Sequence, residues 1–217
     1  ALEALIHEDV GRGQEGLDKM EDMIDRLGQQ ENADLEKAVS KYGEISVEIN
    51  GAEPTIEKLK AMSRKPFQPD AVKAWLLVLR IDIIEKELET GPKATAEINT
   101  AFGELQGFDK AALAPYVLAR IGDYLRKGGQ APQSVAWFEE ILSRPGIDSH
   151  DYAKNALAKI YLNEAGTERK AKALEYVEWV LANSGNNKLT EESAYERASY
   201  FSRQKKWSEA ESYWFEY

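Results

Sequence analysis

Residues 191–217 read EESAYERASYFSRQKKWSEAESYWFEY, and the spacing of their small and aromatic residues decides the fold. Apolar residues recur at intervals of three and four on either side of a polar break, as they do when one short helix turns back onto another. Looser echoes of the pattern occur upstream at a period of about 35 to 45 residues, which is typical of a helical-repeat array. The residues that set the spacing are Ala194, Ala198 and Phe201, followed by Ala210, Trp214 and Tyr217.

The seven prolines separate the rest of the chain into helical segments. Proline suits the first turn of a helix, where its missing amide hydrogen has no intrahelical partner, and it disrupts a helix interior. Five prolines begin segments and two follow the ends of segments, namely Pro54, Pro69, Pro92, Pro115 and Pro132, then Pro66 and Pro145. The predicted helices span residues 14–28, 33–48, 54–64, 69–89, 92–105, 114–128, 132–143, 150–164, 168–183, 190–205 and 207–217. Residues 2–9 can also form a short helix, and the sequence leaves this alternative undecided.

Apolar stripes within these segments favour helices throughout. Val135, Phe138 and Ile141 fall on one helical face, and Ala173 and Val177 begin another stripe of the same kind. A strand would need an alternation of apolar and polar residues bounded by turns, and no segment has one. We therefore predict an all-α protein.

These spacings resemble the tetratricopeptide repeat (TPR) family, whose repeats pair two helices that carry small and aromatic residues at fixed positions. Besides residues 191–217, the similarity is clear where Gly122 precedes Phe138 and where Tyr161 precedes Ala173. The resemblance implies a right-handed α-α superhelix of antiparallel helix pairs, a TPR-like solenoid. Large aromatic residues at these positions are expected to fill the core between helices.

We interpret residues 1–217 as a single helical-repeat domain. Residues 114–217 carry the clearer TPR-like repeats, residues 33–113 carry weak repeats, and residues 1–32 are either a cap or a degenerate repeat. The chain begins with alanine rather than methionine, and its aromatic last helix has no partner after it in the sequence. We therefore expect a fragment of a longer repeat protein of bacterial type.

Composition and charge exclude several classes of partner. The 217 residues carry a net charge of -10, whereas phosphate backbones and anionic lipids attract clustered lysine and arginine. The longest apolar stretch, residues 74–84, is interrupted by Arg80 and Asp82 and is far shorter than the roughly 20 residues that a membrane helix needs. We expect neither nucleic-acid binding nor membrane insertion, and the compartment stays open.

Candidate cofactor and metal sites are weak. Gly11, Gly13 and Gly16 spell the dinucleotide fingerprint, but no buried strand leads into them, so we interpret them as a flexible turn between helices. The sequence has no cysteine, and its only histidines, His7 and His150, lack convergent ligands. The many carboxylates show no spacing that indicates an acid/base pair. We predict no cofactor, no metal, no catalytic residue and no enzyme activity.

The resemblance implies that a partner binds on the inner surface of the superhelix, which the first helix of each pair lines. The candidate binding residues are Tyr116, Asp123, Arg126, Tyr152, Asn155, Lys159, Tyr195 and Ser199. Tyrosine with asparagine, lysine and arginine is a plausible recognition mixture, although it is equally an ordinary helix exterior. A related subtype clamps a terminal carboxylate, but Glu192 and Glu196 stand where that subtype carries cations.

These observations leave two hypotheses open. In the first, the protein is a non-catalytic interaction scaffold that binds a protein or peptide partner on its concave surface. In the second, it is a helical accessory or self-assembly domain that associates through the aromatic end at residues 214–217, because that end would otherwise be exposed.

Overall fold

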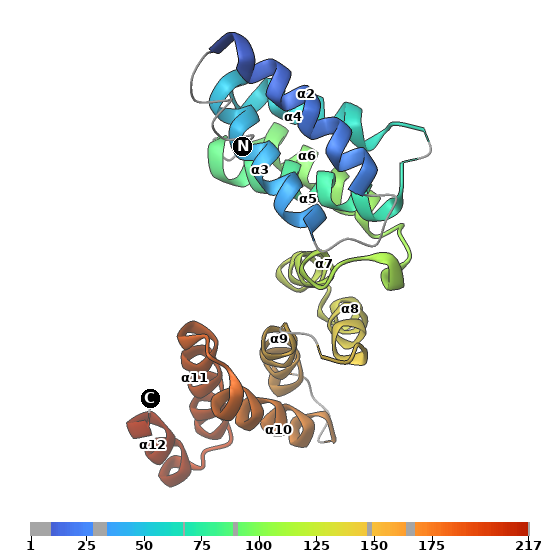
Figure 1. Cartoon of the computed structure of the whole chain (residues 1–217). Helices are drawn as coiled ribbons and strands as arrows, with labels where there is room; N and C mark the ends of the chain where they lie inside the picture. Colours follow the sequence, from blue (N-terminus) through green and yellow to red (C-terminus); the bar gives the residue numbers. More distant parts are fainter. Residues whose placement is uncertain are drawn as a thin grey trace. The chain divides into compact units, whose positions relative to one another are not determined.

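The computed structural model describes residues 10–27, 34–66, 68–88, 91–146, 149–163 and 168–216. Within these ranges the chain forms 11 α-helices and one short 3-10 helix (Figure 1). Helices pack mainly against helices that are close to them in the sequence. The prediction of an all-α protein is confirmed.

The chain divides into two compact units, residues 1–117 and residues 118–217. The boundary falls near the start of one helix. A repeat array also makes its contacts mainly between neighbouring elements, so the single repeat domain stays a prediction.

The observed helices agree with the predicted segments to within four residues at each end. The first unit contains α2 (Val10–Leu27), α3 (Asp34–Asn50), α4 (Ala52–Ser63), α5 (Asp70–Glu87), α6 (Pro92–Leu105) and the 3-10 helix η1 (Lys110–Ala112). The boundary lies in α7 (Pro115–Lys127), and the second unit continues with α8 (Ala131–Ser143), α9 (His150–Asn163), α10 (Glu168–Asn183), α11 (Asn187–Arg203) and α12 (Trp207–Glu216).

The three glycines of the apparent dinucleotide fingerprint lie inside α2, so their interpretation as a turn is wrong. Downstream of them, Leu17, Met20 and Ile24 are buried on one face of α2, and this packing outweighs the low helix propensity of glycine. A Cβ on Gly13 would lie 2.7 Å from Cδ1 of Ile49 on α3, so glycine permits the close approach of these two helices. The expected helix at 2–9 and His7 lie outside the described residues.

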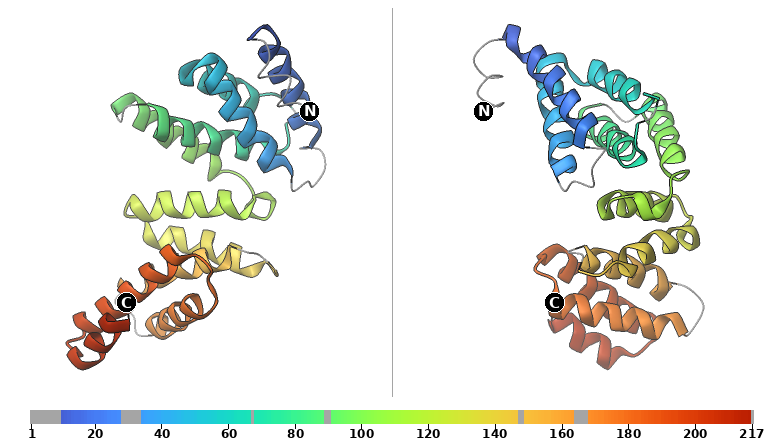
Figure 2. Two further views of the ribbon diagram at one scale, coloured as in Figure 1. Left: turned by 60° about the vertical axis from the view of Figure 1, so that its left-hand side comes forward. Right: turned by 45° about the vertical axis from the view of Figure 1, so that its right-hand side comes forward.

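Helix α5 is the centre of the first unit. Helices α3, α4 and α6 all pack against it (Figure 2). Ten of its residues are buried, among them Leu76, Ile81 and Ile84, which explains the long apolar stretch in the sequence. Its one deeply buried charge is Arg80, whose Nη2 donates to the carbonyl oxygen of Glu97 at 3.3 Å.

The second unit is built around the stripes that the sequence predicted. Phe138 and Ile141 of α8 are fully buried, as are the members of the α10 stripe at Ala173 and Val177. At the contact between α7 and α8, a Cβ on Gly122 would lie 2.7 Å from Cζ of Phe138. Glycine at this position therefore lets the Phe138 ring pack directly against the backbone of α7.

The stretch that indicated the fold is only partly buried. Ala194, Ala198 and Ala210 lie in the core, and Phe201 is half-buried. Trp214, which the pattern assigned to the core, is instead 40% exposed and packs edge-on against Tyr195 of α11. Tyr217 lies outside the described residues.

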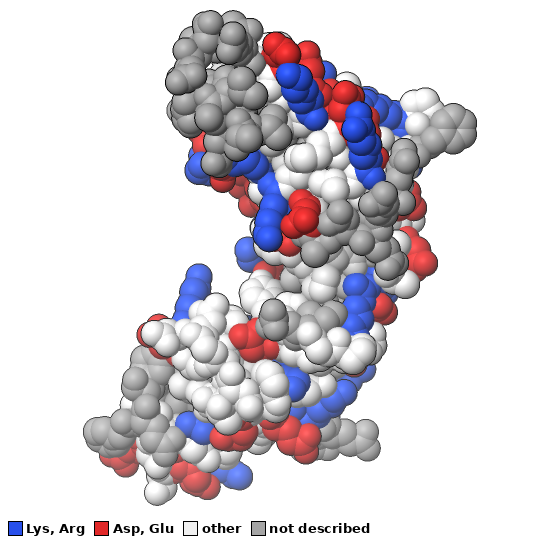
Figure 3. Space-filling model, in the orientation of Figure 1, with Lys and Arg blue, Asp and Glu red and all other residues white. Residues whose placement is uncertain are grey.

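Two surface properties bear on the expected partners. In the described part of the chain, no helix combines the length and the apolar character that crossing a bilayer requires. On the face that Figure 3 shows, lysine and arginine side chains are interspersed with aspartate and glutamate.

Candidate functional site

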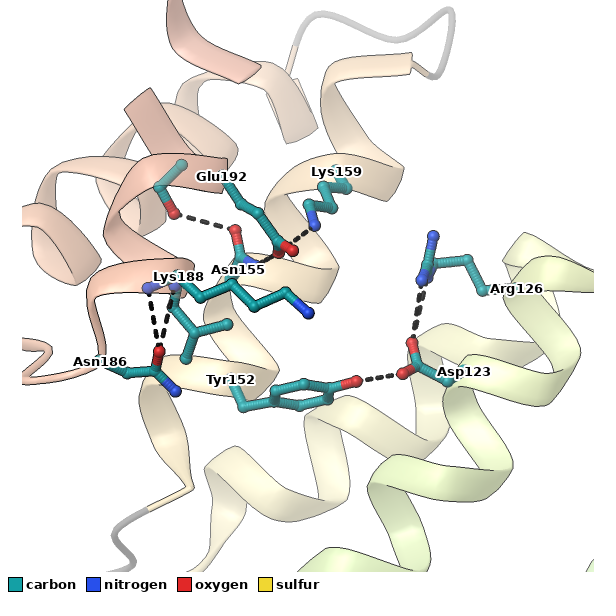
Figure 4. Close-up of polar contacts among 10 residues, drawn as sticks. Asp123, Arg126, Tyr152, Asn155, Lys159, Asn186, Lys188 and Glu192 are labelled. Atoms are coloured by element: carbon teal, nitrogen blue, oxygen red, sulfur yellow. Dashed lines mark hydrogen bonds and ion pairs between the residues drawn. The ribbon is translucent and has the colours of Figure 1, made fainter. Parts of the chain in front are cut away.

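A polar pocket of about 380 Å³ lies in the second unit between α7, α9 and α11. Five of the eight residues predicted to bind a partner line it, namely Asp123, Arg126, Tyr152, Asn155 and Lys159 (Figure 4). The other lining residues are Lys127, Ala156, Asn186, Lys188, Leu189 and Glu192. The pocket is therefore the candidate functional site.

One side of the pocket is organised around Asp123 on α7. Arg126, one turn further along the same helix, donates from Nε and Nη2 to Oδ1 of Asp123 at 3.2 and 3.1 Å. Tyr152 on α9 donates its hydroxyl hydrogen to Oδ2 of the same carboxylate. Both carboxylate oxygens thus accept hydrogen bonds, so the carboxylate fixes the phenol and the guanidinium in place.

The ionisation state of Tyr152 follows from this arrangement. Burial raises the pKa of Tyr152, and the hydrogen bond to Asp123 and the charge of that carboxylate raise the pKa further. The phenol therefore stays protonated at neutral pH and acts as a hydrogen-bond donor rather than as a base.

The other side of the pocket joins α9 to α11 through Glu192. Lys159 Nζ donates to Glu192 Oε2 at 2.5 Å, and Asn155 Nδ2 donates to the same oxygen at 2.9 Å. The buried Ser193 donates from Oγ to Asn155 Oδ1 at 2.9 Å. This bond leaves the Asn155 amide nitrogen facing Glu192, so the amide orientation is set by its two neighbours.

The charge of Glu192 is stabilised where it lies. Burial opposes its ionisation, but the hydrogen bond and charge of Lys159 outweigh burial, with help from Asn155 and from the charge of Lys188. Together they lower the pKa of Glu192 below the ordinary 4.5. Glu192 is therefore a carboxylate at neutral pH.

Lys188 reaches into the pocket from the first turn of α11. The side chain of Asn186 caps this helix by accepting from the backbone amides of Lys188 and Leu189 at 3.1 and 3.4 Å. The cap starts the helix at Asn187, three residues before the predicted start at 190. In Figure 4 the Lys188 ammonium extends across the pocket, and it forms no hydrogen bond or ion pair with the described residues.

The pocket has an excess of positive charge in a chain that is strongly acidic overall. Its lining carries four basic side chains and two acidic ones. Asp123 and Glu192 are both engaged by neighbouring donors, whereas Lys127 and Lys188 are exposed to solvent. The excess positive charge of the lining therefore lies on these two exposed ammonium groups.

Three predicted binding residues lie elsewhere. Tyr116 belongs to the first unit, where it stacks on Trp75 with ring centroids 5.7 Å apart. Tyr195 is 51% exposed, and its ring lies against Trp214 of α12. Ser199, one turn beyond Tyr195, is half-buried. These residues do not line the pocket.

The sequence interpretation missed Glu192 and Lys188 as members of the site. Glu192 lies three residues before Tyr195 and therefore on the same helical stripe, which was a usable signal. Lys188 fell outside the predicted helix because the cap at Asn186 was not recognised. An Asn followed by the start of an apolar-periodic segment is a known helix-start pattern that could have placed it.

The two carboxylates of the pocket both accept hydrogen bonds from neighbouring side chains. Within the described ranges, no group of three or more histidine, cysteine, aspartate or glutamate side chains converges as metal ligands would. The Nε2 atom of His150 lies 3.1 Å from the carbonyl oxygen of Ile141 and 2.9 Å from that of Arg144. These contacts connect the start of α9 to the end of α8. Arg126 and Tyr152 donate to Asp123. Lys159 and Asn155 donate to Glu192.

The comparisons with known proteins bring no assignment, because no family model, no curated protein and no solved structure matches the chain.

Proposed function

We propose that the protein is a non-catalytic interaction scaffold and that the pocket between α7, α9 and α11 binds a peptide segment of a partner protein. The observation that carries the proposal is the gathering of five predicted recognition residues from two helices around one pocket of about 380 Å³. The volume is within the range of about 300–1,000 Å³ that ligand pockets have. TPR-like stacking of antiparallel helix pairs is part of the proposal, supported by the repeat spacing and by the crossing at Gly122.

The partner segment is expected to be acidic. The lining has an excess of two positive charges, and the two exposed ammonium groups of Lys127 and Lys188 are available to a partner carboxylate. Tyr152 and Asn155 add uncharged polar groups and apolar surface beside these cations. Such a combination favours a peptide with acidic side chains over a neutral or basic one.

A partner carboxylate would compete with Glu192, which already holds Lys159 and Asn155. The internal carboxylate keeps these donors satisfied while the pocket is empty, so the free protein has no buried unpaired charge there. It also makes binding weaker than the number of cations suggests. Moderate affinity is the expected result.

The proposal can be tested by selecting peptides from a displayed random library on the folded chain. Selected peptides should be enriched in aspartate and glutamate. In a fluorescence titration, the double substitution Lys127→Gln and Lys188→Gln should weaken binding of the selected peptides by about tenfold or more, because two attractive charges are removed.

The matched control is the double substitution Lys170→Gln and Lys205→Gln, which removes the same charge from residues of the second unit that do not line the pocket. Its effect on affinity should be small. Equal losses in the two double variants would mean that the peptides respond to net charge alone, and the pocket would be rejected as the binding site.

A second candidate function is self-association through the aromatic end of the second unit. It is favoured by the exposure of Tyr195, Trp207 and Trp214, which are 51%, 65% and 40% exposed. Large aromatic side chains are enriched at protein interfaces relative to the rest of the surface. Sedimentation at increasing protein concentration should then show assembly that Trp214→Ala abolishes, whereas a monomer at all concentrations would remove this candidate.

A further inference from the structure

We infer that a groove in the first unit binds an arginine or lysine side chain, with a neighbouring apolar side chain, from a partner polypeptide. The groove has a volume of about 410 Å³ and lies between α4 and α6, with α5 beneath it. Helices α4 and α6 both pack against α5, so the space between them is closed from below. This site is separate from the pocket of the second unit and does not depend on its function.

The floor of the groove is apolar. Ile56 of α4 and Ile84 of α5 are 6% and 2% exposed and form its base, and Leu88 at the end of α5 is half-buried beside them. Pro92 and Ala94 of α6 complete the apolar lining. Apolar surface of this kind favours an occupant that buries methylene groups.

The α4 side of the rim is acidic. Glu53 and Glu57 line the groove, are both exposed and lie four residues apart on one face of α4, where like charges repel. Glu53 forms no ion pair with the described residues, and the Glu57 contact with Lys60 is a long 3.7 Å. Lys60 also contacts Glu97 at 3.5 Å, so its charge is shared between two carboxylates.

The third carboxylate, Glu97, is already compensated. Besides Lys60, it contacts the buried Arg80, whose Nη2 lies 3.5 Å from Glu97 Oε2. On the α6 side of the rim the exposed Lys93 is positive. The groove is therefore electrostatically asymmetric, and the negative side at Glu53 and Glu57 is where a cation from a partner would be attracted.

Arginine and lysine match both properties of the groove. Their methylene stems can cover apolar surface while the charged head stays near water and carboxylates. An arginine head can also bind two carboxylate oxygens with parallel hydrogen bonds. The volume exceeds that of one such side chain, which leaves space for an adjacent apolar residue, and a cation at this rim relieves the repulsion between Glu53 and Glu57.

The test uses the whole chain labelled with nitrogen-15 and two capped tripeptides. The first is Ac-Leu-Arg-Leu-NH2, and the second replaces arginine by citrulline, which has the same shape without the charge. The arginine peptide should give saturable shifts of backbone amides near residues 53–57 and 91–97. The citrulline peptide should bind about tenfold more weakly, because its neutral N–H groups can still donate but no longer carry the positive charge that strengthens the hydrogen bond.

Two double variants complete the experiment. Glu53→Gln with Glu57→Gln should remove the preference for arginine over citrulline, because both rim charges are gone. Glu44→Gln with Glu48→Gln on α3 removes two exposed glutamates at the same spacing, outside the groove, and should keep the preference. Circular dichroism verifies that both variants stay folded.

The proposal is overturned if the two peptides bind equally, if the amide shifts lie outside the groove, or if no saturable binding occurs up to the solubility limit of the arginine peptide. It is also overturned if the α3 variant loses the preference as completely as the α4 variant does. None of these outcomes bears on the pocket of the second unit, whose ligand is acidic.

Discussion

Lys159 on α9 and Glu192 on α11 form an ion pair in which the ammonium nitrogen lies 2.5 Å from Glu192 Oε2. The pair puts an internal carboxylate in the pocket that we propose to bind an acidic peptide segment. The two residues are 33 positions apart in the sequence, so the pair joins α9 to α11. The same contact therefore contributes to the packing of the second unit and to the affinity of the proposed site.

Replacing Glu192 by glutamine should raise the affinity for an acidic peptide by about fivefold, because one repulsive charge leaves the pocket. Stability should fall by about 1 kcal/mol or less, since the Glu192 side chain is 34% exposed and glutamine still accepts hydrogen bonds. Peptide titration and urea unfolding measure the two effects. The control is Glu196→Gln, one turn further along α11 and outside the pocket lining, and a lower affinity in the Glu192 variant would contradict the account.

The stability that Glu192 contributes should depend on pH. Its pKa is lowered in the folded protein from the ordinary 4.5. Below that pH the unfolded chain binds a proton more readily than the folded chain, so the contribution is present above pH 4.5 and is lost as the pH falls through the folded pKa. The free energies of unfolding of the native chain and of Glu192→Gln should therefore converge as the pH falls below 4.5. A difference that stays constant as the pH falls below 4.5 would contradict the lowered pKa.

Replacing Tyr152 by phenylalanine should cost about 1 kcal/mol of stability, because Asp123 loses one hydrogen-bond donor but keeps Arg126. Tyr195→Phe is the matched control: this tyrosine is 51% exposed, so its hydroxyl group is expected to contribute little. Urea unfolding of both variants provides the comparison. Equal stabilities of the two variants would show that the Tyr152 hydroxyl group does not organise the pocket.

Gly122→Ala should destabilise the second unit by about 1–3 kcal/mol, because the new methyl group would overlap the fully buried Phe138 ring. Gly103→Ala on α6 is the opposite case, since no atom lies within 4 Å of the added Cβ. That substitution should stabilise by up to about 1 kcal/mol through helix propensity. Thermal unfolding of the two variants should shift in opposite directions, and a harmless Gly122→Ala would refute the close crossing of α7 and α8.

Asn186→Ala should cost about 1 kcal/mol, because the first turn of α11 loses the acceptor that caps its amides. Asn187→Ala, at the first helical residue, tests the same amino-acid change without removing that capping side chain. The capping variant should also weaken peptide binding, since the cap holds the turn that carries Lys188. Unchanged stability would contradict the assigned helix start.

Much of the fold could be predicted because its signals are local. Pro92 and Pro115 each occupy the first residue of a helix, as their chemistry requires. The errors occurred where tertiary contacts or caps decided the outcome. Glycines in α2 resembled a turn, yet the burial of Leu17 and its stripe extends the helix through them.

For the candidate site, the sequence pattern could predict which face of a helix carries the polar residues, but not which turn of that helix lies at the pocket. Asp123 and Tyr152 were predicted because each lies on the face of a first helix that points away from its partner helix, and a hydrogen bond joins the two side chains. On α11 the sequence pattern selected the wrong turn of the helix. Tyr195 packs on Trp214, whereas Glu192, one turn earlier, lines the pocket. Which turn of a stripe meets a neighbouring helix depends on packing that the sequence pattern does not specify.

The central claim is that the pocket of the second unit binds an acidic peptide segment. Amide chemical-shift mapping with a selected acidic peptide tests it most directly. The account predicts that the largest shifts occur in residues 123–127, 152–159 and 186–192, and that they disappear when Lys127 and Lys188 are replaced by glutamine. Shifts concentrated in α12, or shifts in these segments that persist in the double variant, would contradict it.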